Sequence, residues 1–385
     1  MSKIIALLSG KGGSGKTTLS LCMSNLLSSV NKKVLLIDCD MSTNGATYFY
    51  ESRLESDGGK SITTFSDIIT GKISNENEFI YAFYPLAINN NFFFIPSITS
   101  VGQYDDSIEK SGYVDGISVH KFCRWVKKEY DIVLFDCQAG YSYFLPALLI
   151  DMDTYLVVSE TDAISSSALR VFHVKIAKYI NQLKIYQVFN KASKEEYEIY
   201  SKISGGTLFT IIDTIEYNWQ IRKDFALAQV PDFQSGNARF WQQICNLCEV
   251  LFREDVYSAC NEFKEMVLLP TIEKELNILK EEKIFGVRNR KSKIKTLMVS
   301  AISIYASVVV VLLSFLYFTR NEFLSDSRLY STVLLCIGGI ALISAFSTMR
   351  QVLNLTKDFR SDDSDYKEKK AELLRIQEKL ISSKL

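Results

Sequence analysis

A glycine-rich loop near the N-terminus carries the residues whose chemistry is easiest to interpret. It contains Gly10, Lys11, Gly12, Gly13, Ser14, Gly15, Lys16, Thr17 and Thr18. Glycines let backbone N–H groups turn inward around phosphate oxygens. In the Gly-x(4)-Gly-Lys-Thr pattern, Lys16 reaches the β- and γ-phosphates and the Thr17 hydroxyl holds Mg²⁺. The loop therefore predicts a nucleoside triphosphate site; the alternative is a glycine-rich turn before an ordinary helix.

Three aspartates follow apolar runs and predict the other half of the same site. Asp38 and Asp40 come at the end of the run that begins at Val34, and Asp136 ends the run 130–136. Ligands bind at the carboxyl ends of strands in open α/β sheets, and carboxylates are ligands for Mg²⁺. We expect Asp136 to hold Mg²⁺ through water. Asp38 and Asp40 have an alternative interpretation as helix caps.

The elements that must position these residues alternate between strands and helices. A strand at 4–8, the loop and a helix from Leu19 give the context that a phosphate-binding loop needs. The expected further strands are 34–37, 91–95, 130–136, 154–159, 185–190 and one from residue 210, and the expected helices include 119–129, 165–183 and 236–256. This order predicts an α/β P-loop NTPase fold with a mostly parallel sheet flanked by helices.

Lys11, placed directly after the first glycine, makes the loop resemble a known family. The stretch Lys-Gly-Gly-Ser-Gly-Lys-Thr-Thr is similar to the deviant Walker A loop of the ParA/MinD family, in the SIMIBI class of P-loop ATPases. The resemblance covers residues 1–255. It implies that Lys11 reaches across a homodimer interface to the partner's ATP, and that Lys11, Lys16 and Asp40 are catalytic. It also implies that Asp40 orients the attacking water, while Asp38 supports the metal held by Thr17 and Asp136.

The same resemblance suggests where the adenine ring binds. Asn190, at the end of the strand 185–190, matches a family asparagine that contacts the base. Pro231 and Asp232, in a proline-containing loop, are further candidate adenine contacts. An asparagine that only caps a turn is the alternative for Asn190. The family often has Pro-Gln after the residue that Asp40 matches, whereas this chain has Met41-Ser42.

Composition limits the other classes of function. The chain has 385 residues, with 44 Lys and Arg against 44 Asp and Glu, so its net charge does not indicate nucleic acid binding. Its 2 histidines lie in no motif, which argues against histidine acid–base chemistry. Eight scattered cysteines are expected to be reduced, and Cys245 and Cys248 are interpreted as core residues rather than metal ligands.

The C-terminal third departs from the resemblance and predicts membrane attachment. Residues 256–295 read as a helical, basic connector. Residues 296–319 and 329–349 are uncharged runs of the length that a transmembrane helix needs, and residues 361–385 read as a helical tail. Basic residues flank the pair of runs, which places both ends inside a multi-pass protein of the inner (cytoplasmic) membrane, with the ATPase domain and the tail in the cytoplasm. A buried hairpin in a soluble protein is the alternative.

Together these patterns suggest a membrane-anchored ATPase that uses ATP and Mg²⁺. Its ATP-dependent homodimer and hydrolysis would form a switch that recruits or positions an unidentified protein partner at the membrane. One alternative is an ATP-binding sensor or scaffold, with slow turnover, in a defence or secretion assembly. The other is a bacterial tyrosine kinase-like protein, but the tail contains only Tyr366, not a tyrosine cluster.

Overall fold

The computed structural model describes residues 2–56, 62–73, 83–98, 113–180, 184–203, 209–233, 237–319 and 327–382. Within helices, the side chains of some of these residues are also outside the description. The chain divides into two compact units, Met1–Thr271 and Ile272–Leu385. The first unit ends at Thr271, whereas the sequence predicts that the ATPase domain ends at residue 255.

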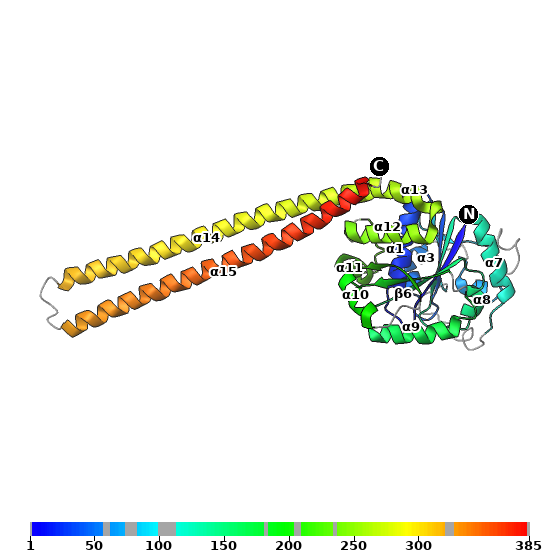
Figure 1. The fold of residues 1–385 in the computed structure, drawn as a ribbon, viewed down its shortest axis with the longest axis horizontal. Helices are drawn as coiled ribbons and strands as arrows, with labels where there is room; N and C mark the ends of the chain where they lie inside the picture. Colours follow the sequence, from blue (N-terminus) through cyan, green and yellow to red (C-terminus); the bar gives the residue numbers. More distant parts are fainter. Residues whose placement is uncertain are drawn as a thin grey trace. The chain divides into compact units, whose positions relative to one another are not determined.

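A twisted sheet forms the centre of the first unit (Figure 1). Its described strands follow the order β3-β4-β2-β5-β1-β6-β7-β8, and all neighbours are parallel except β3 and β4. This confirms the predicted α/β class with a mostly parallel sheet. The strands are β1 (Lys3–Leu8), β2 (Val34–Cys39), β3 (Leu86–Ala87), β4 (Phe92–Ile95), β5 (Ile132–Cys137), β6 (Thr154–Ser159), β7 (Ile185–Asn190) and β8 (Thr210–Ile215).

Helices cover both faces of this sheet, which explains why its central strands are apolar on both sides. The helices α1, α12 and α13 contact one another on one face, while α7 contacts both α4 and α8 on the other. The described helices of this unit are α1 (Lys16–Ser29), α2 (Gly45–Phe49), α3 (Glu51–Ser56), α4 (Phe65–Ile69), α7 (Gly116–Glu129), α8 (Leu145–Leu149), α9 (Ala163–Ile176), α10 (Lys194–Ile203), α11 (Trp219–Ala226), α12 (Ala238–Phe252) and α13 (Glu254–Phe263).

Strand register brings the predicted carboxylates to one edge of the sheet. In β2 and β5, Asp38 lies directly opposite Asp136, and Asp136 is also opposite Leu7 of β1. Because β1 ends one residue later and the glycine loop follows, Asp136 lies next to the start of that loop. The shared register is thus the structural basis of the candidate site.

The second unit is a pair of long helices that run antiparallel as a hairpin (Figure 1). A π-helix, Lys264–Leu268, joins α13 to α14 (Leu269–Thr319) without a break, and Pro270 follows it as the second residue of α14. The second helix is α15 (Ser327–Ser382). Lys283 joins the two helices: its ammonium lies 2.8 Å from the Asp363 carboxylate and 4.1 Å from the centre of the Tyr366 ring.

The predicted connector, spans and tail are segments of these two continuous helices. Runs 296–319 and 329–349 are helical, as expected, but many of their side chains and the link 320–326 lie outside the described residues. Among the residues described, no helix is long and apolar enough to cross a membrane. The structure therefore does not support the two predicted membrane spans.

Candidate functional site

The glycine loop connects β1 to α1 and has two positions that only glycine fits well. Gly15 caps α1 with φ of +91°, and an added Cβ would lie 2.1 Å from the Asn190 amide nitrogen. At Gly10, an added Cβ would lie 2.6 Å from the backbone nitrogen of Leu169, in α9. These close approaches hold the loop between the N-terminus of α1, β7 and α9.

Lys16 is buried at the start of α1 and points back toward β1. Its ammonium donates to the Ser9 hydroxyl at 2.8 Å, and that hydroxyl donates to the Lys11 carbonyl at 2.9 Å. A buried ammonium needs strong acceptors, and one hydroxyl satisfies it only in part. Lys16 is therefore positioned to donate hydrogen bonds to anionic oxygens that bind in the loop.

Lys11 is held by two carboxylates of the same chain. Its ammonium lies 3.2 Å from Asp162 and 3.3 Å from Glu160. Desolvation acts against its charge, but these two partners raise its pKa overall. Burial likewise opposes ionisation of Asp162, but hydrogen bonds from Ser165 and Lys11 lower the pKa of this carboxyl to about 2. Lys11 thus has an intramolecular ion pair that it must leave before it can act elsewhere.

Lys191 connects this ion-pair group to the glycine loop. Its ammonium lies 2.7 Å from Glu160 and donates to the Gly13 carbonyl. Glu160 therefore bridges Lys11 and Lys191. No sequence motif marked Lys191, Glu160 or Asp162 as site residues. Lys191 has a positive φ just after the strand that ends at Asn190, which a sequence pattern does not reveal.

Asp38 and Asp40 organise the segment that follows β2. Both oxygens of buried Asp38 accept hydrogen bonds, from the Asp40 N–H at 2.9 Å and from the Thr47 N–H and hydroxyl at 2.8 and 2.7 Å. Burial and the nearby Asp136 raise the pKa of Asp38 to about 7. Asp40 accepts from the backbone and hydroxyl groups of Ser42 and Thr43. Asp40 thus holds the turn that follows β2, and it also lines the cavity described below.

Asp136 has the environment of a metal-binding carboxylate. Neither oxygen has a hydrogen-bond partner among the described residues, and its side chain is buried. Burial raises its pKa to about 6, an effect that the Lys16 ammonium partly offsets. An unpartnered buried carboxylate is costly unless a cation approaches it. With the Thr17 hydroxyl at the start of α1, its oxygen chemistry fits Mg²⁺.

A cavity of about 730 Å³ opens in front of the loop. Its lining next to the loop comes from the glycine loop with Lys16, Thr17 and Thr18, the segment after β2, Gln138-Ala139 after β5, and the end of β7 at Asn190. Gln138 donates to Ser42 at 3.0 Å, which links the segments after β5 and β2. The volume is within the range for small-molecule sites.

The far wall of the cavity comes from residues that the sequence did not indicate. Asn190 lines the cavity and donates to the Ser14 carbonyl at 2.8 Å. Pro231 and Asp232 are not among the lining residues, and the Pro231 carbonyl instead accepts from Asn25 of α1. The wall is built from α2, α11 and the turn before α11, through Tyr48, Phe49, Tyr217, Ile221 and Phe225.

Comparison with known proteins agrees with this arrangement. A family model described as an AAA domain matches residues 2–188. An uncharacterised ATP-binding protein from Methanocaldococcus jannaschii is 26% identical over 200 residues, which are 52% of this chain and 68% of that protein. The residues matched by the AAA-domain model include the glycine loop.

Solved structures share the fold of the first unit. A putative plasmid partition protein from Borrelia burgdorferi, bound to AMPPNP, superposes with a TM-score of 0.52 at 19% identity over 66% of this chain and 100% of the other. The septum site-determining protein MinD from Pyrococcus horikoshii, complexed with Mg-ADP, gives 0.51 at 19% identity over 67% and 99%. The first unit therefore has the fold of P-loop ATPases of the MinD and plasmid-partition type.

Proposed function

We propose that the first unit binds and hydrolyses ATP and that its ATP-bound form is a homodimer. The observation that carries this proposal is the cavity in front of the glycine loop, which is lined by the buried Lys16, by Thr17 and by the segments after β2 and β5. Asp136, whose buried oxygens have no hydrogen-bond partner among the described residues, lies two residues before Gln138 of that lining. The fold relatives bound to AMPPNP and to Mg-ADP support the nucleotide assignment.

The residues that hold the phosphates act through charge and position. Lys16 exchanges the Ser9 hydroxyl for phosphate oxygens, and the N-terminus of α1 adds its partial positive charge. Thr17 and Asp136 hold Mg²⁺, which supplies charge neutralisation in phosphoryl transfer. Asp38 keeps the segment after β2 in place through Thr47, so we assign it a supporting role.

Lys11 makes catalysis depend on the second subunit. It leaves Glu160 and Asp162 and reaches the nucleotide of the partner, as the resemblance to ParA/MinD proteins implies. Asp40 releases part of its contacts with Ser42 and Thr43 and orients the attacking water. Because Gln138 contacts Ser42, a movement of the segment after β2 also moves the segment after β5.

The biological role that fits this chemistry is a switch that positions or recruits a partner. Two fold relatives are named for plasmid partition and septum-site determination, which are positioning processes. The test is to measure the ATP turnover of the full chain against the lifetime of its ATP-bound dimer. Turnover faster than dimer exchange would favour a cycling switch, whereas negligible turnover would favour the sensor or scaffold alternative.

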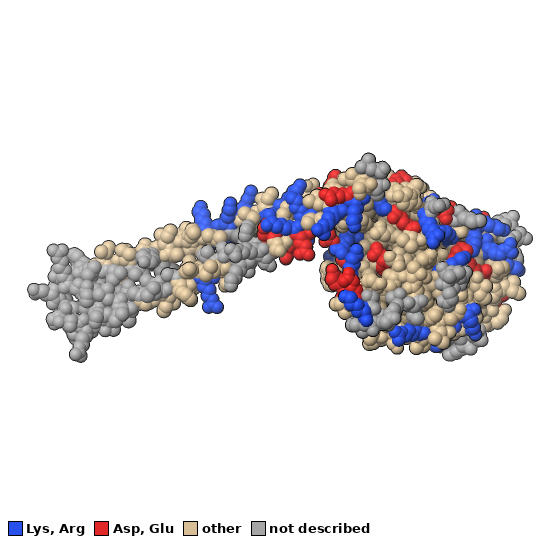
Figure 2. Space-filling model, in the orientation of Figure 1, with Lys and Arg blue, Asp and Glu red and all other residues tan. Residues whose placement is uncertain are grey.

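We further propose that the second unit anchors the chain in the inner membrane. At 1.5 Å per residue, the runs 296–319 and 329–349 extend about 36 Å and about 31 Å, close to the thickness of the hydrocarbon core. Large apolar side chains within them are exposed, among them Val310 and Leu313, each 61% exposed, and Phe346, 73% exposed. Figure 2 shows basic side chains along α14 before a stretch without charge. Exposed apolar area of this kind marks a lipid or protein contact.

The anchor is tested by chemical labelling from outside the cell. A cysteine introduced in place of Ser325, between the two runs, should react with a membrane-impermeant maleimide, while Cys22 of the first unit should not. Extraction of the chain from membranes by alkaline carbonate, without detergent, would contradict the anchor.

A further inference from the structure

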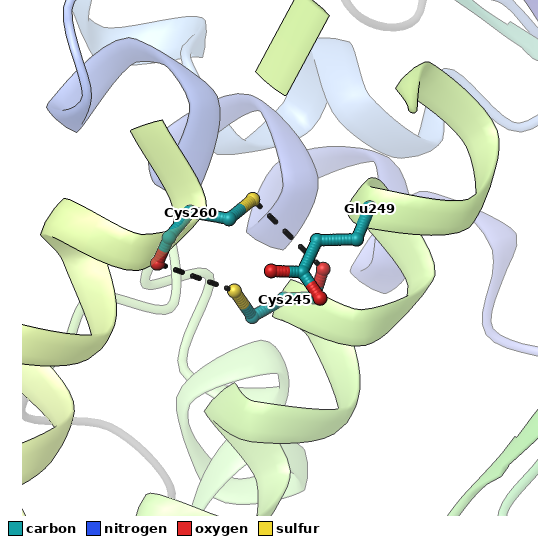
Figure 3. A group of neighbouring side chains, drawn as sticks. All are labelled: Cys245, Glu249 and Cys260. Carbon is teal, nitrogen blue, oxygen red and sulfur yellow. Dashed lines mark hydrogen bonds between the residues drawn. The ribbon is translucent and has the colours of Figure 1, made fainter. Parts of the chain in front are cut away.

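A cluster of ligand-type side chains lies in the first unit, outside the cavity described above (Figure 3). Cys245 and Glu249 are one turn apart on α12, and Cys260 comes from α13. The two sulfurs and a Glu249 carboxylate oxygen all lie within 4.8 Å of one another. Around a tetrahedral Zn²⁺, with Zn–S of about 2.3 Å, ligand atoms are about 3.8 Å apart. A closure of about 1 Å would therefore bring these atoms onto one ion.

The two thiols are free and have weak partners. Both are fully buried, and neither is in a disulfide. The Cys245 thiol donates to the Cys260 carbonyl at 3.8 Å, and the Cys260 thiol donates to the Cys245 carbonyl at 4.0 Å. Thiols are weak donors, so little is lost when these contacts are exchanged for metal–sulfur bonds. Burial without disulfide pairing is also compatible with simple core packing, so a further observation is needed.

Lys264 provides that observation. Its ammonium lies 2.5 Å from one oxygen of Glu249, and the side chains of the two residues are only 13% and 19% exposed. A carboxylate has a second oxygen, so pairing with Lys264 leaves Glu249 able to bind an ion. A lysine–glutamate pair beside two buried thiols is more than apolar packing requires.

Charge balance favours a divalent ion with two thiolates. In the metal-free site, two neutral thiols and the Lys264–Glu249 pair sum to zero charge. A divalent ion that displaces both thiol protons adds two positive and two negative charges, so the sum stays at zero. Because a net charge in a buried site is costly, this exchange avoids the main electrostatic penalty. Lys264 then acts as the outer partner of a ligating carboxylate, a common arrangement around metals.

We propose that Cys245, Cys260 and Glu249 bind a thiophilic divalent ion such as Zn²⁺, with Lys264 as the charge partner of the carboxylate. Two sulfur ligands select Zn²⁺ over Mg²⁺ or Ca²⁺. Three protein ligands leave the fourth tetrahedral position to water. The ion joins α12 to α13 across the corner at Arg253, which has φ of +49°. Metal binding therefore stabilises the end of the first unit.

The full chain is first treated with a chelator and kept reduced, in detergent and without nucleotide. Co²⁺ and then Zn²⁺ are titrated into this metal-free protein. We expect one Co²⁺ per chain with sulfur-to-cobalt charge-transfer absorption, loss of that absorption on addition of Zn²⁺, and release of about two protons per ion. The nucleotide site offers oxygen ligands, so it cannot produce this absorption. Absence of the absorption in the parent chain would overturn the proposal.

Variants assign the site to these residues. Cys245→Ser and Cys260→Ser should each abolish the charge-transfer absorption, and Glu249→Gln should weaken Co²⁺ binding at least tenfold. Cys248→Ser is the matched control, because Cys248 is a buried cysteine of the same helix but is not part of the cluster. Circular dichroism checks that each variant is folded without metal. Unchanged absorption in the folded Cys245→Ser and Cys260→Ser variants would contradict the assignment.

Discussion

The contact between Lys11 and Asp162 leads to a quantitative prediction about dimer formation. If Lys11 must leave Asp162 and Glu160 to act across the interface, then weakening this contact should favour the ATP-bound dimer. Asp162→Asn is a suitable change, because Asp162 also caps α9 by accepting from the Ser165 N–H at 2.9 Å. Asparagine keeps a cap acceptor while it removes the charge.

The expected magnitude follows from the exposure of the pair. The Lys11 and Asp162 side chains are 31% and 42% exposed, so their contact is a surface ion pair worth about 0.2–1 kcal/mol. Each dimer releases two such contacts, or about 0.4–2 kcal/mol in total. At 1.4 kcal/mol per tenfold, Asp162→Asn should tighten the dimer about 2- to 30-fold.

Sedimentation of the full chain in detergent, with AMPPNP and Mg²⁺, would measure this dimerisation constant. Asp363→Asn is the control, because it removes a lysine–carboxylate pair in the second unit and should leave the constant unchanged. The gain from Asp162→Asn should also shrink at high salt, since surface ion pairs are screened. A dimer that is weakened by Asp162→Asn, or unaffected by it, would refute the idea that this contact restrains Lys11.

Three other predictions concern the site itself. Asp40→Ala should bind ATP and dimerise but release phosphate slowly, as measured by a phosphate-release assay, because water positioning acts in the transition state. Gly15→Ala should weaken nucleotide binding in a calorimetric titration more than Gly13→Ala does; both positions have positive φ, but only the Cβ at Gly15 meets Asn190. The pKa of Asp136 is raised in the folded state, so its contribution to the unfolding free energy of the nucleotide-free chain should be lost as pH rises from about 4 to about 6. Denaturant titration should show that Asp136→Asn reduces this loss.

Each of these predictions can fail in a distinct way. Normal phosphate release by Asp40→Ala would leave that residue only its hydrogen bonds with Ser42 and Thr43. Equal effects of Gly13→Ala and Gly15→Ala would mean that backbone strain, rather than the contact with Asn190, sets the cost. A pH dependence that is the same with and without Asp136 would show that its burial does not control ionisation.

Local patterns in the sequence were enough to predict the sheet and the phosphate end of the site. The glycine loop lies between β1 and α1, and the predicted carboxylates Asp38 and Asp136 face each other in register. Short-range signals suffice there, because a strand, a tight loop and a helix start are encoded by adjacent residues. The roles of these residues in catalysis stay predictions.

Features built from distant segments were not apparent in the sequence. The contact of Lys11 with Glu160 and Asp162 joins positions about 150 residues apart, and the fold alone brings them together. Similarly, Cys245 was interpreted only as a core residue, and its contact with Cys260 comes from the packing of α12 against α13. The helical wall of the cavity that contains Phe225 was likewise not apparent in the sequence. Long-range packing leaves no periodic signal in a single sequence.

The central claim, an ATP-dependent dimer completed by Lys11, is tested most directly by comparing Lys11→Ala with Lys16→Ala. Nucleotide affinity, sedimentation and phosphate release are measured on the full chain of both variants and the parent. We expect Lys16→Ala to bind ATP poorly. Lys11→Ala should bind ATP but should neither dimerise nor hydrolyse it. Hydrolysis by Lys11→Ala at the rate of the parent would contradict the claim, because the nucleotide would then need no lysine from a second subunit.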